Sequence, residues 1–253
     1  MAAPLTVDGR YATIDGEGLA MPRVFQPTGM LLAERVVFGV FEPADHGAYV
    51  DLIPPPFSPS HDPKVYVYVV SFDEVSPWPL APYREASVFI SVRHGQMEGW
   101  YPLTMPVTGR VAQQGGRRRG FPKEMAVVSL SESGEGWVGS AVRDNQLLLR
   151  VEVARVREIG DDFDDPGTPY SGVPILNLVP PLIGPKVVMT TVETLSPPVV
   201  TRYAGEMTTG VDPGYPWSPL LQSGFVGYFE SSRGARVLRH GRVAARFTTN
   251  GDS

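Results

Sequence analysis

Alternation of apolar and polar residues is the main pattern along this chain, and it predicts β-strands. The segment 64–72, KVYVYVVSF, alternates over its whole length and is rich in β-branched and aromatic residues. Three further runs of this kind predict strands at 32–41, 87–93 and 101–107. A short helix or turn is expected after the first of these, before the prolines at 54–56 end it.

The segment 124–156 predicts an antiparallel meander of three strands. Two turn sequences, SESGEG at 131–136 and DN at 144–145, separate its three apolar runs. The first turn also contains a G-x-G-x-x-G match at 134–139. A dinucleotide-binding fingerprint needs a helix after these glycines. A strand is expected there instead, so we interpret the match as a hairpin turn.

The remaining sequence predicts more strands, joined by long irregular stretches. Strands are expected at 186–195, 225–230 and 235–247, the last as one strand or as a hairpin around 240–241. Stretches of mixed, acidic or Gly/Pro-rich sequence are expected to be irregular, at 1–30, 157–174 and 197–219. Helical periodicity is scarce, and no internal repeat or linker divides the chain. The sequence therefore predicts one β-rich domain over residues 1–253.

Composition and charge exclude several classes of protein. The net charge of −5 argues against a nucleic-acid binder, which would carry a basic field. No apolar run approaches the roughly 20 residues of a membrane-spanning helix, and the opening residues MAAPL do not resemble a signal peptide. We therefore expect a cytoplasmic protein. The absence of cysteine excludes disulfides and thiol catalysis, and the four histidines show no metal-ligand spacing, so no metal is predicted.

Lysine is rare in this sequence, which makes each lysine informative. Only Lys64, Lys123 and Lys186 occur among 22 basic residues. An arginine-rich chain keeps a lysine where an amine is required, although compositional drift would give the same count. Lys123 lies in the segment 115–125, GGRRRGFPKEM, where a glycine-rich loop leads through Phe-Pro into a predicted strand. Partial desolvation beside this Phe-Pro pair would disfavour the charged form of the amine.

The three arginines at 117–119 allow more than one interpretation. They could form a solvated loop or a clamp for an anionic group near Lys123, because guanidinium groups match carboxylates. A nucleic-acid patch is the least favoured interpretation, since the run is isolated and lacks interleaved aromatic residues.

Several segments in the same order resemble the acetoacetate decarboxylase family. Gly-Phe-Pro-Lys at 120–123 resembles the family's Schiff-base lysine motif, and PYREA at 82–86 is similar to its segment with an active-site glutamate. Arg35, the strand after it and LIPPPF at 52–57 resemble the family's arginine, strand and proline segment. The resemblance spans about residues 25–245, and the order and spacing of the motifs carry most of it.

The resemblance implies an α+β fold, mainly antiparallel β, whose curved sheets form a cone- or barrel-like core with Lys123 inside. Lys123 would form an iminium with a ketone, Glu85 would transfer protons or orient the amine, and Arg35 would pair with Glu85. The residues expected to contact the substrate are Arg119, Phe121 and Met105. The expected partner is a small oxo acid, in a homo-oligomer that needs no cofactor, no nucleic acid and no membrane.

The sequence departs from the family at the residue after the lysine, where Glu124 replaces a second lysine. On a regular strand, Lys123 and Glu124 point to opposite faces; if the backbone kinks, the two side chains pair. The first arrangement is favoured. A second alignment places Arg117 at the lysine position, where an arginine forms no Schiff base. We reject this alignment because it splits the Phe-Pro-Lys motif and fits the distance from Glu85 less well.

Three functions remain open. The favoured one is a Schiff-base lyase that decarboxylates a 3-oxo acid, with an aldolase-dehydratase or cyclase acting on a 2-oxo acid as the near-even alternative. The second is a lysine-independent cyclase or isomerase that uses Glu85 and Arg35. The third is a non-catalytic module that binds a small molecule.

Overall fold

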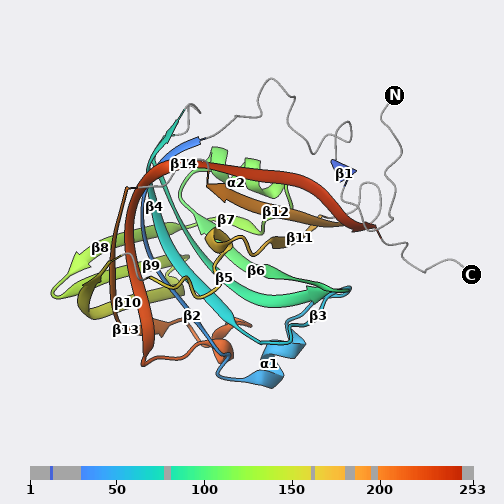
Figure 1. Ribbon diagram of the computed structural model, residues 1–253. Helices are drawn as coiled ribbons and strands as arrows, with labels where there is room; N and C mark the ends of the chain where they lie inside the picture. The colour runs from blue at the N-terminus through green and yellow to red at the C-terminus, as the bar shows by residue number, and fades with distance from the viewer. Residues whose placement is uncertain are drawn as a thin grey trace, which may run out of the picture.

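Strands dominate the molecule, as the alternating pattern predicts (Figure 1). The computed structural model describes residues 12–13, 30–76, 81–160, 163–179, 186–194 and 199–246. The helices are α1 (His46–Asp51) and α2 (Arg110–Arg117), with single 3-10 turns η2 (Pro169–Ser171) and η3 (Ser218–Leu220). The strands are β1 (Ala12–Thr13), β2 (Met30–Phe41), β3 (Ser58–Pro59), β4 (Val65–Ser76), β5 (Tyr83–His94), β6 (Met97–Val107), β7 (Lys123–Met125), β8 (Val127–Ser133), β9 (Gly136–Arg143), β10 (Gln146–Ile159), β11 (Ile175–Val179), β12 (Lys186–Thr194), β13 (Val199–Gly210) and β14 (Phe225–Arg246).

These strands form one large mixed sheet in the order β12–β11–β6–β5–β4–β2–β14–β13–β10–β9–β8. Among the described strands, only β11 with β6 and β6 with β7 pair in parallel. The long strand β14 pairs with β2 and β13 along its first part and with β12 along its last part. The sheet therefore curls strongly, as Figure 1 shows for β14 and the strands beneath it. The predicted fold class is confirmed.

Alternation along the central strands separates two faces of the sheet. One apolar cluster includes Val37, Val67 and Val88, and the other includes Val36 and Phe89. We call these the Val67 face and the Phe89 face. Because successive strand residues point to opposite sides, a shift of one residue moves a side chain from one face to the other.

A loop covers part of the Phe89 face. Phe163 packs against the cluster on that face, and the indole N–H of Trp100 donates to the Gly167 carbonyl at 2.8 Å. The carboxylate of Asp165 accepts the backbone N–H groups of Gly167 and Thr168 at 2.9 and 2.6 Å. This part of the acidic stretch 157–174 is irregular, as predicted, and its own hydrogen bonds hold its shape.

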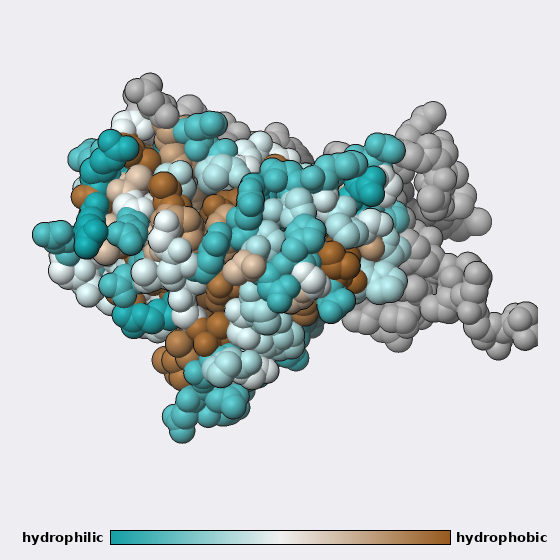
Figure 2. Space-filling model, turned by 90° about the horizontal axis from the view of Figure 1, so that it is seen from below, coloured by the Kyte–Doolittle hydropathy of each residue, from teal (hydrophilic) through white to brown (hydrophobic). Residues whose placement is uncertain are grey.

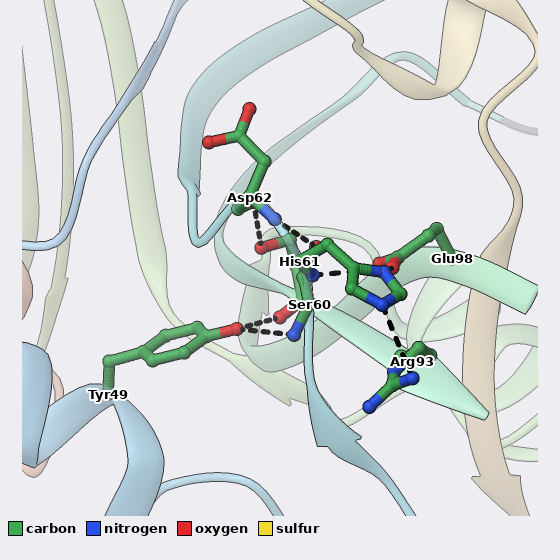
Figure 3. A network of polar contacts seen from close by, with 7 residues as sticks. Tyr49, Ser60, His61, Asp62, Arg93 and Glu98 are labelled. Atoms are coloured by element: carbon green, nitrogen blue, oxygen red, sulfur yellow. Dashed lines mark hydrogen bonds and ion pairs between the residues drawn. The ribbon is translucent and has the colours of Figure 1, made fainter. Parts of the chain in front are cut away.

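A polar network holds the segment before β4 (Figure 3). The hydroxyl of Tyr49 on α1 accepts the backbone N–H of Ser60 at 3.0 Å. Nδ1 of His61 contacts Glu98 at 2.6 Å, and its Nε2 lies 3.4 Å from Nη1 of Arg93. Both ring nitrogens of His61 therefore have a partner, which fits a structural role for this histidine.

The face seen in Figure 2 is mostly hydrophilic, and the apolar groups visible on it form separate patches. The large exposed apolar side chains among the described residues come from four different elements, and they are Val50, Val111, Val127 and Val226. Single exposed valines are ordinary on a folded surface. No helix in the described ranges is both long and apolar enough to cross a bilayer.

The structure corrects three expectations about local structure. The stretch 197–219 is not irregular throughout, because β13 pairs on both sides with β10 and β14. The predicted separation of 225–230 from 235–247 is wrong, since β14 is continuous over 22 residues. The start of the glycine-rich loop belongs to α2. The turn at 134–135 does join β8 to β9 as a hairpin, while most of 1–30 and residue 247 lie outside the described residues.

Candidate active site

The Lys123 side chain lies against a carboxylate on the Phe89 face. Lys123 opens β7, whose parallel pairing with β6 places it beside Met105. Its Nζ donates to Oε2 of Glu85 on β5 at 2.5 Å. Lys123 is 9% exposed and Glu85 is 4% exposed, so the ion pair is buried. The structure thus brings together the lysine and the glutamate that the resemblance singled out.

The route of the Lys123 side chain depends on Gly116 in α2. A Cβ atom at Gly116 would lie 2.7 Å from Cε and 3.0 Å from Cγ of Lys123, well inside the usual contact distance of about 3.5–4.0 Å. The backbone N–H groups of Arg119 and Phe121 donate to the Gly116 carbonyl at 2.9 and 3.1 Å. Nε of Arg117 donates to the Lys123 carbonyl at 2.6 Å. This glycine and the tight turn after it direct the amine towards β5.

A phenol holds the second oxygen of Glu85. The hydroxyl of Tyr68 on β4 donates to Oε1 at 2.5 Å. Burial, reinforced by the Glu85 charge, raises the pKa of Tyr68 well above its ordinary value. The hydroxyl therefore stays protonated and keeps donating at neutral pH. Sequence reasoning gave Tyr68 no role, because alternation places it on one face of a strand but does not show which strand pairs with it.

Apolar and aromatic groups surround the amine. The ring centroids of Tyr83 and Phe121 lie 5.8 and 6.0 Å from Nζ of Lys123. Met105 and Phe121 belong to the buried cluster of the Phe89 face. Such a lining lowers the local dielectric and strengthens the interaction between the amine and Glu85. Two of the three predicted substrate contacts, Phe121 and Met105, therefore lie beside Lys123.

Arg119 brings a second cation to this region. Burial lowers the pKa of the Arg119 guanidinium. The charge of Arg119 in turn lowers the pKa of the Tyr83 hydroxyl, but the burial of Tyr83 raises that pKa by more. Its backbone carbonyl accepts from Nδ2 of Asn177 at 3.3 Å. Within the ranges that the structure describes, its guanidinium has no hydrogen bond or ion pair. A partly buried cation without a partner is costly, so Arg119 is suited to bind an anionic group of a ligand.

Arg35 lies outside this cluster, and its predicted pairing with Glu85 is wrong. Its side chain is 48% exposed, and Nε and Nη2 bind the carboxylate of Asp73 at 2.8 and 3.1 Å. The cause is the alternation along β2. Val36 packs on the Phe89 face, so the side chain of Arg35 points away from that face.

Glu34 faces the side on which an arginine was expected. It is 2% exposed, and its two carboxylate oxygens accept from the hydroxyls of Ser232 and Tyr170 at 3.2 and 3.4 Å. Glu230 is buried nearby on β14 and binds Nε of Arg202 at 2.7 Å. The Phe89 face therefore carries further buried carboxylates besides the partner of Lys123.

Glu124 points away from the amine. Its Oε1 accepts from the hydroxyl of Thr104 at 3.1 Å, and its Oε2 pairs with Arg143 on β9. The backbone of β7 continues as a strand between Lys123 and Glu124, so the favoured arrangement with opposite faces is the observed one. Arg117 is exposed and binds only a backbone carbonyl in this region, which agrees with rejecting the alignment that puts it at the lysine position.

The described side chains offer a defined set of reactive groups. They are an amine, a carboxylate, phenols and a guanidinium, within one region of the Phe89 face. Within the described ranges, no group of three or more His, Cys, Asp or Glu side chains is arranged to hold a metal ion.

Comparison with known proteins identifies the family of this chain. Residues 20–211 match the family model described as acetoacetate decarboxylase (ADC). The chain belongs to the acetoacetate decarboxylase family. No curated protein matches the chain.

Three solved structures share the fold of this chain. One acetoacetate decarboxylase has a TM-score of 0.68 at 14% identity, over 86% of this chain and 91% of that one. The acetoacetate decarboxylase of Legionella pneumophila subsp. pneumophila str. Philadelphia 1 has a TM-score of 0.67 at 16% identity, over 98% and 93%. The enduracididine biosynthesis enzyme MppR, complexed with the condensation product of pyruvate and imidazole 4-carboxaldehyde, has a TM-score of 0.67 at 15% identity, over 97% and 100%.

Proposed function

We propose that this chain is a carbon–carbon lyase that forms a Schiff base between Lys123 and an oxo acid, and that it decarboxylates a 3-oxo acid. The observation that carries the proposal is the buried contact of 2.5 Å between Nζ of Lys123 and Glu85. Beside it, the guanidinium of Arg119 has no ion-pair partner in the described part of the chain and can take a substrate carboxylate.

The first step is the formation of an iminium. Glu85 accepts a proton from Lys123, and the neutral amine attacks the ketone carbon of the substrate. The resulting carbinolamine loses its oxygen as water after that oxygen has gained a proton. The positive iminium nitrogen stays beside the carboxylate of Glu85, which favours its charge.

The second step uses the iminium as an electron sink. In a 3-oxo acid, the bond between the carboxylate and C2 breaks, carbon dioxide leaves, and the bonding electrons form an enamine. Glu85, which is a carboxylate at this stage, takes up a proton from solvent and delivers it to C2, which restores the iminium. Water then hydrolyses the iminium to the ketone product and regenerates Lys123.

One observation favours the alternative, aldolase-dehydratase or cyclase chemistry on a 2-oxo acid. A carboxylate held by Arg119 is stabilised as an anion, which opposes its loss as carbon dioxide and suits a reaction that keeps it. MppR, which has a similar fold, has been solved with pyruvate. The lysine-independent alternative loses support, because Arg35 binds Asp73 rather than Glu85.

Intact-protein mass spectrometry after borohydride reduction tests the proposal. Wild-type protein is incubated with acetoacetate or with pyruvate, and Lys123→Ala is the control. We expect an adduct on the wild type only, with release of carbon dioxide from acetoacetate. An adduct without gas would support the 2-oxo acid alternative. Equal adducts on the wild type and on Lys123→Ala, or none from a wider panel of oxo acids, would refute the Schiff base at Lys123.

Three further expectations concern the domain organisation, the location and the oligomeric state of the protein. A single domain over 1–253, a cytoplasmic location and a homo-oligomer remain predictions from the sequence and the family resemblance.

A further inference from the structure

The Tyr83 hydroxyl is a polar group beside Lys123 that the chemistry above leaves unused. Tyr83 opens β5, two residues before Glu85, so both side chains project from the same face. Its ring packs on Phe72 with centroids 4.8 Å apart. A Cβ atom at Gly109 would lie 3.2 Å from Cβ of Tyr83, so the chain fits closely around this residue. The ring is therefore held firmly in place.

The hydroxyl of this firmly held ring has no partner of its own. In the part of the chain that the structure describes, it neither donates nor accepts a hydrogen bond. The hydroxyl of Tyr68, by contrast, already donates to Glu85 at 2.5 Å. A partly buried hydroxyl without a partner is unfavourable, and a ligand oxygen can satisfy it.

The surroundings of Tyr83 place its ring beside the amine of Lys123. Nζ of Lys123 lies 5.8 Å from its ring centroid, and the charges of Glu85 and Arg119 both act on its hydroxyl. Burial is the main cause that raises the pKa of Tyr83 above its ordinary range. The Tyr83 hydroxyl therefore stays protonated and can donate a hydrogen bond at neutral pH.

We propose that Tyr83 donates a hydrogen bond to the carbonyl oxygen of the substrate while Lys123 attacks the carbonyl carbon. This inference rests on the proposed Schiff-base function. Arg119 would hold the substrate carboxylate, Glu85 would move the protons, and Tyr83 would stabilise the oxygen that becomes negative. Tyr83 is then a catalytic residue of the imine-forming step.

The step balances without a proton from Tyr83. The new bond joins Nζ to the carbonyl carbon, and the electrons of the carbonyl π bond move to the oxygen. The proton that leaves Nζ passes to Glu85 and from there to this oxygen. A second proton, taken from the nitrogen through Glu85, lets the oxygen leave as water. Tyr83 donates a hydrogen bond throughout and keeps its own proton.

The test compares Tyr83→Phe with Tyr101→Phe. Both variants delete one phenolic oxygen, and neither hydroxyl has a hydrogen bond in the described ranges. Tyr101 packs with the cluster of the Val67 face, away from Lys123. The rate of imine formation is measured by borohydride quenching at successive times after mixing with acetoacetate. Binding of butyrate, which has a carboxylate but no ketone, is measured by calorimetry.

We expect imine formation to slow about 10²–10³-fold in Tyr83→Phe, the usual effect of losing one oxyanion donor. Butyrate affinity should be unchanged, and Tyr101→Phe should form the imine at the wild-type rate. A wild-type rate in Tyr83→Phe would overturn the inference and leave the proposed function intact. Equal losses of rate and of butyrate affinity would also overturn it, because they indicate a general disturbance of the site. A wild type that forms no adduct with acetoacetate, with pyruvate or with a wider panel of oxo acids would refute the proposed function, and this inference would fall with it.

Discussion

Replacement of Gly116 by alanine tests whether the position of the Lys123 amine sets the rate. The added Cβ would lie 2.7 Å from Cε of Lys123, whereas carbon atoms pack at about 3.5–4.0 Å. The lysine side chain must therefore retreat by about 0.8 Å or more. Its Nζ now lies 2.5 Å from Glu85, so this shift breaks the contact.

The expected effect falls on activity far more than on stability. A misplacement of about 1 Å costs roughly 10²-fold in rate, so kcat/KM for the substrate should fall by about that factor in Gly116→Ala. Overpacking costs about 1–3 kcal/mol, and alanine recovers about 1 kcal/mol of helix propensity over glycine in α2. At this chain length each kcal/mol shifts Tm by about 2–4 °C, so Tm should fall by only a few degrees.

A neighbouring glycine supplies the control. In Gly115→Ala the new Cβ would meet only Nη1 of Arg119, at 4.0 Å, which is ordinary contact. Both variants change one glycine of the same helix, and only Gly116 approaches the lysine. Initial rates and thermal unfolding are measured for both. Full activity in Gly116→Ala, or equal losses in both variants, would refute the argument that this close approach positions the amine.

Three further predictions concern side chains around the lysine. Tyr68→Phe removes the donor to Glu85, worth about 1.5–3 kcal/mol for a charged partner, so kcat should fall about tenfold or more; unchanged kcat would show that Glu85 needs no such support. Arg119→Met should raise KM for oxo acids at least tenfold while neutral ketones are still trapped on the lysine at the wild-type rate, and an unchanged KM would remove Arg119 from carboxylate binding. Arg143→Leu leaves the charge of Glu124 without its cation, so Tm should fall, and adding Glu124→Gln should restore most of it; no recovery in the double variant would contradict this account.

The sequence predicted the local β structure well wherever alternation was regular. Patterns that depend only on near neighbours predicted the strands around 64–72 and 87–93 and the meander at 124–156, which the structure shows as β8, β9 and β10. β13 could not be predicted in the same way. Its sequence, VVTRYAGEMTTG, mixes glycine, charge and apolar residues, and it is a strand because β10 and β14 pair with it on both sides.

The candidate site shows the same limit. The family resemblance singled out Lys123 and Glu85, and the structure places them in contact. The resemblance failed for Arg35, because a single step along β2 decides which of Glu34 and Arg35 faces inward. The hydroxyls of Tyr68 and Tyr83 also escaped prediction. Their importance depends on which strands are neighbours, and that arrangement is set by contacts between distant parts of the chain.

The three-residue strand β7 separates two ion pairs, one on each of its faces. The charge of Lys123 is balanced from β5 on one side, and that of Glu124 is balanced from β9 on the other. An engineer who restored the second lysine of the family through Glu124→Lys would place two cations, the new lysine and Arg143, on the far side of the strand. The charges of residues 124 and 143 are therefore coupled. A substitution that changes the charge at one of these positions calls for a compensating substitution at the other.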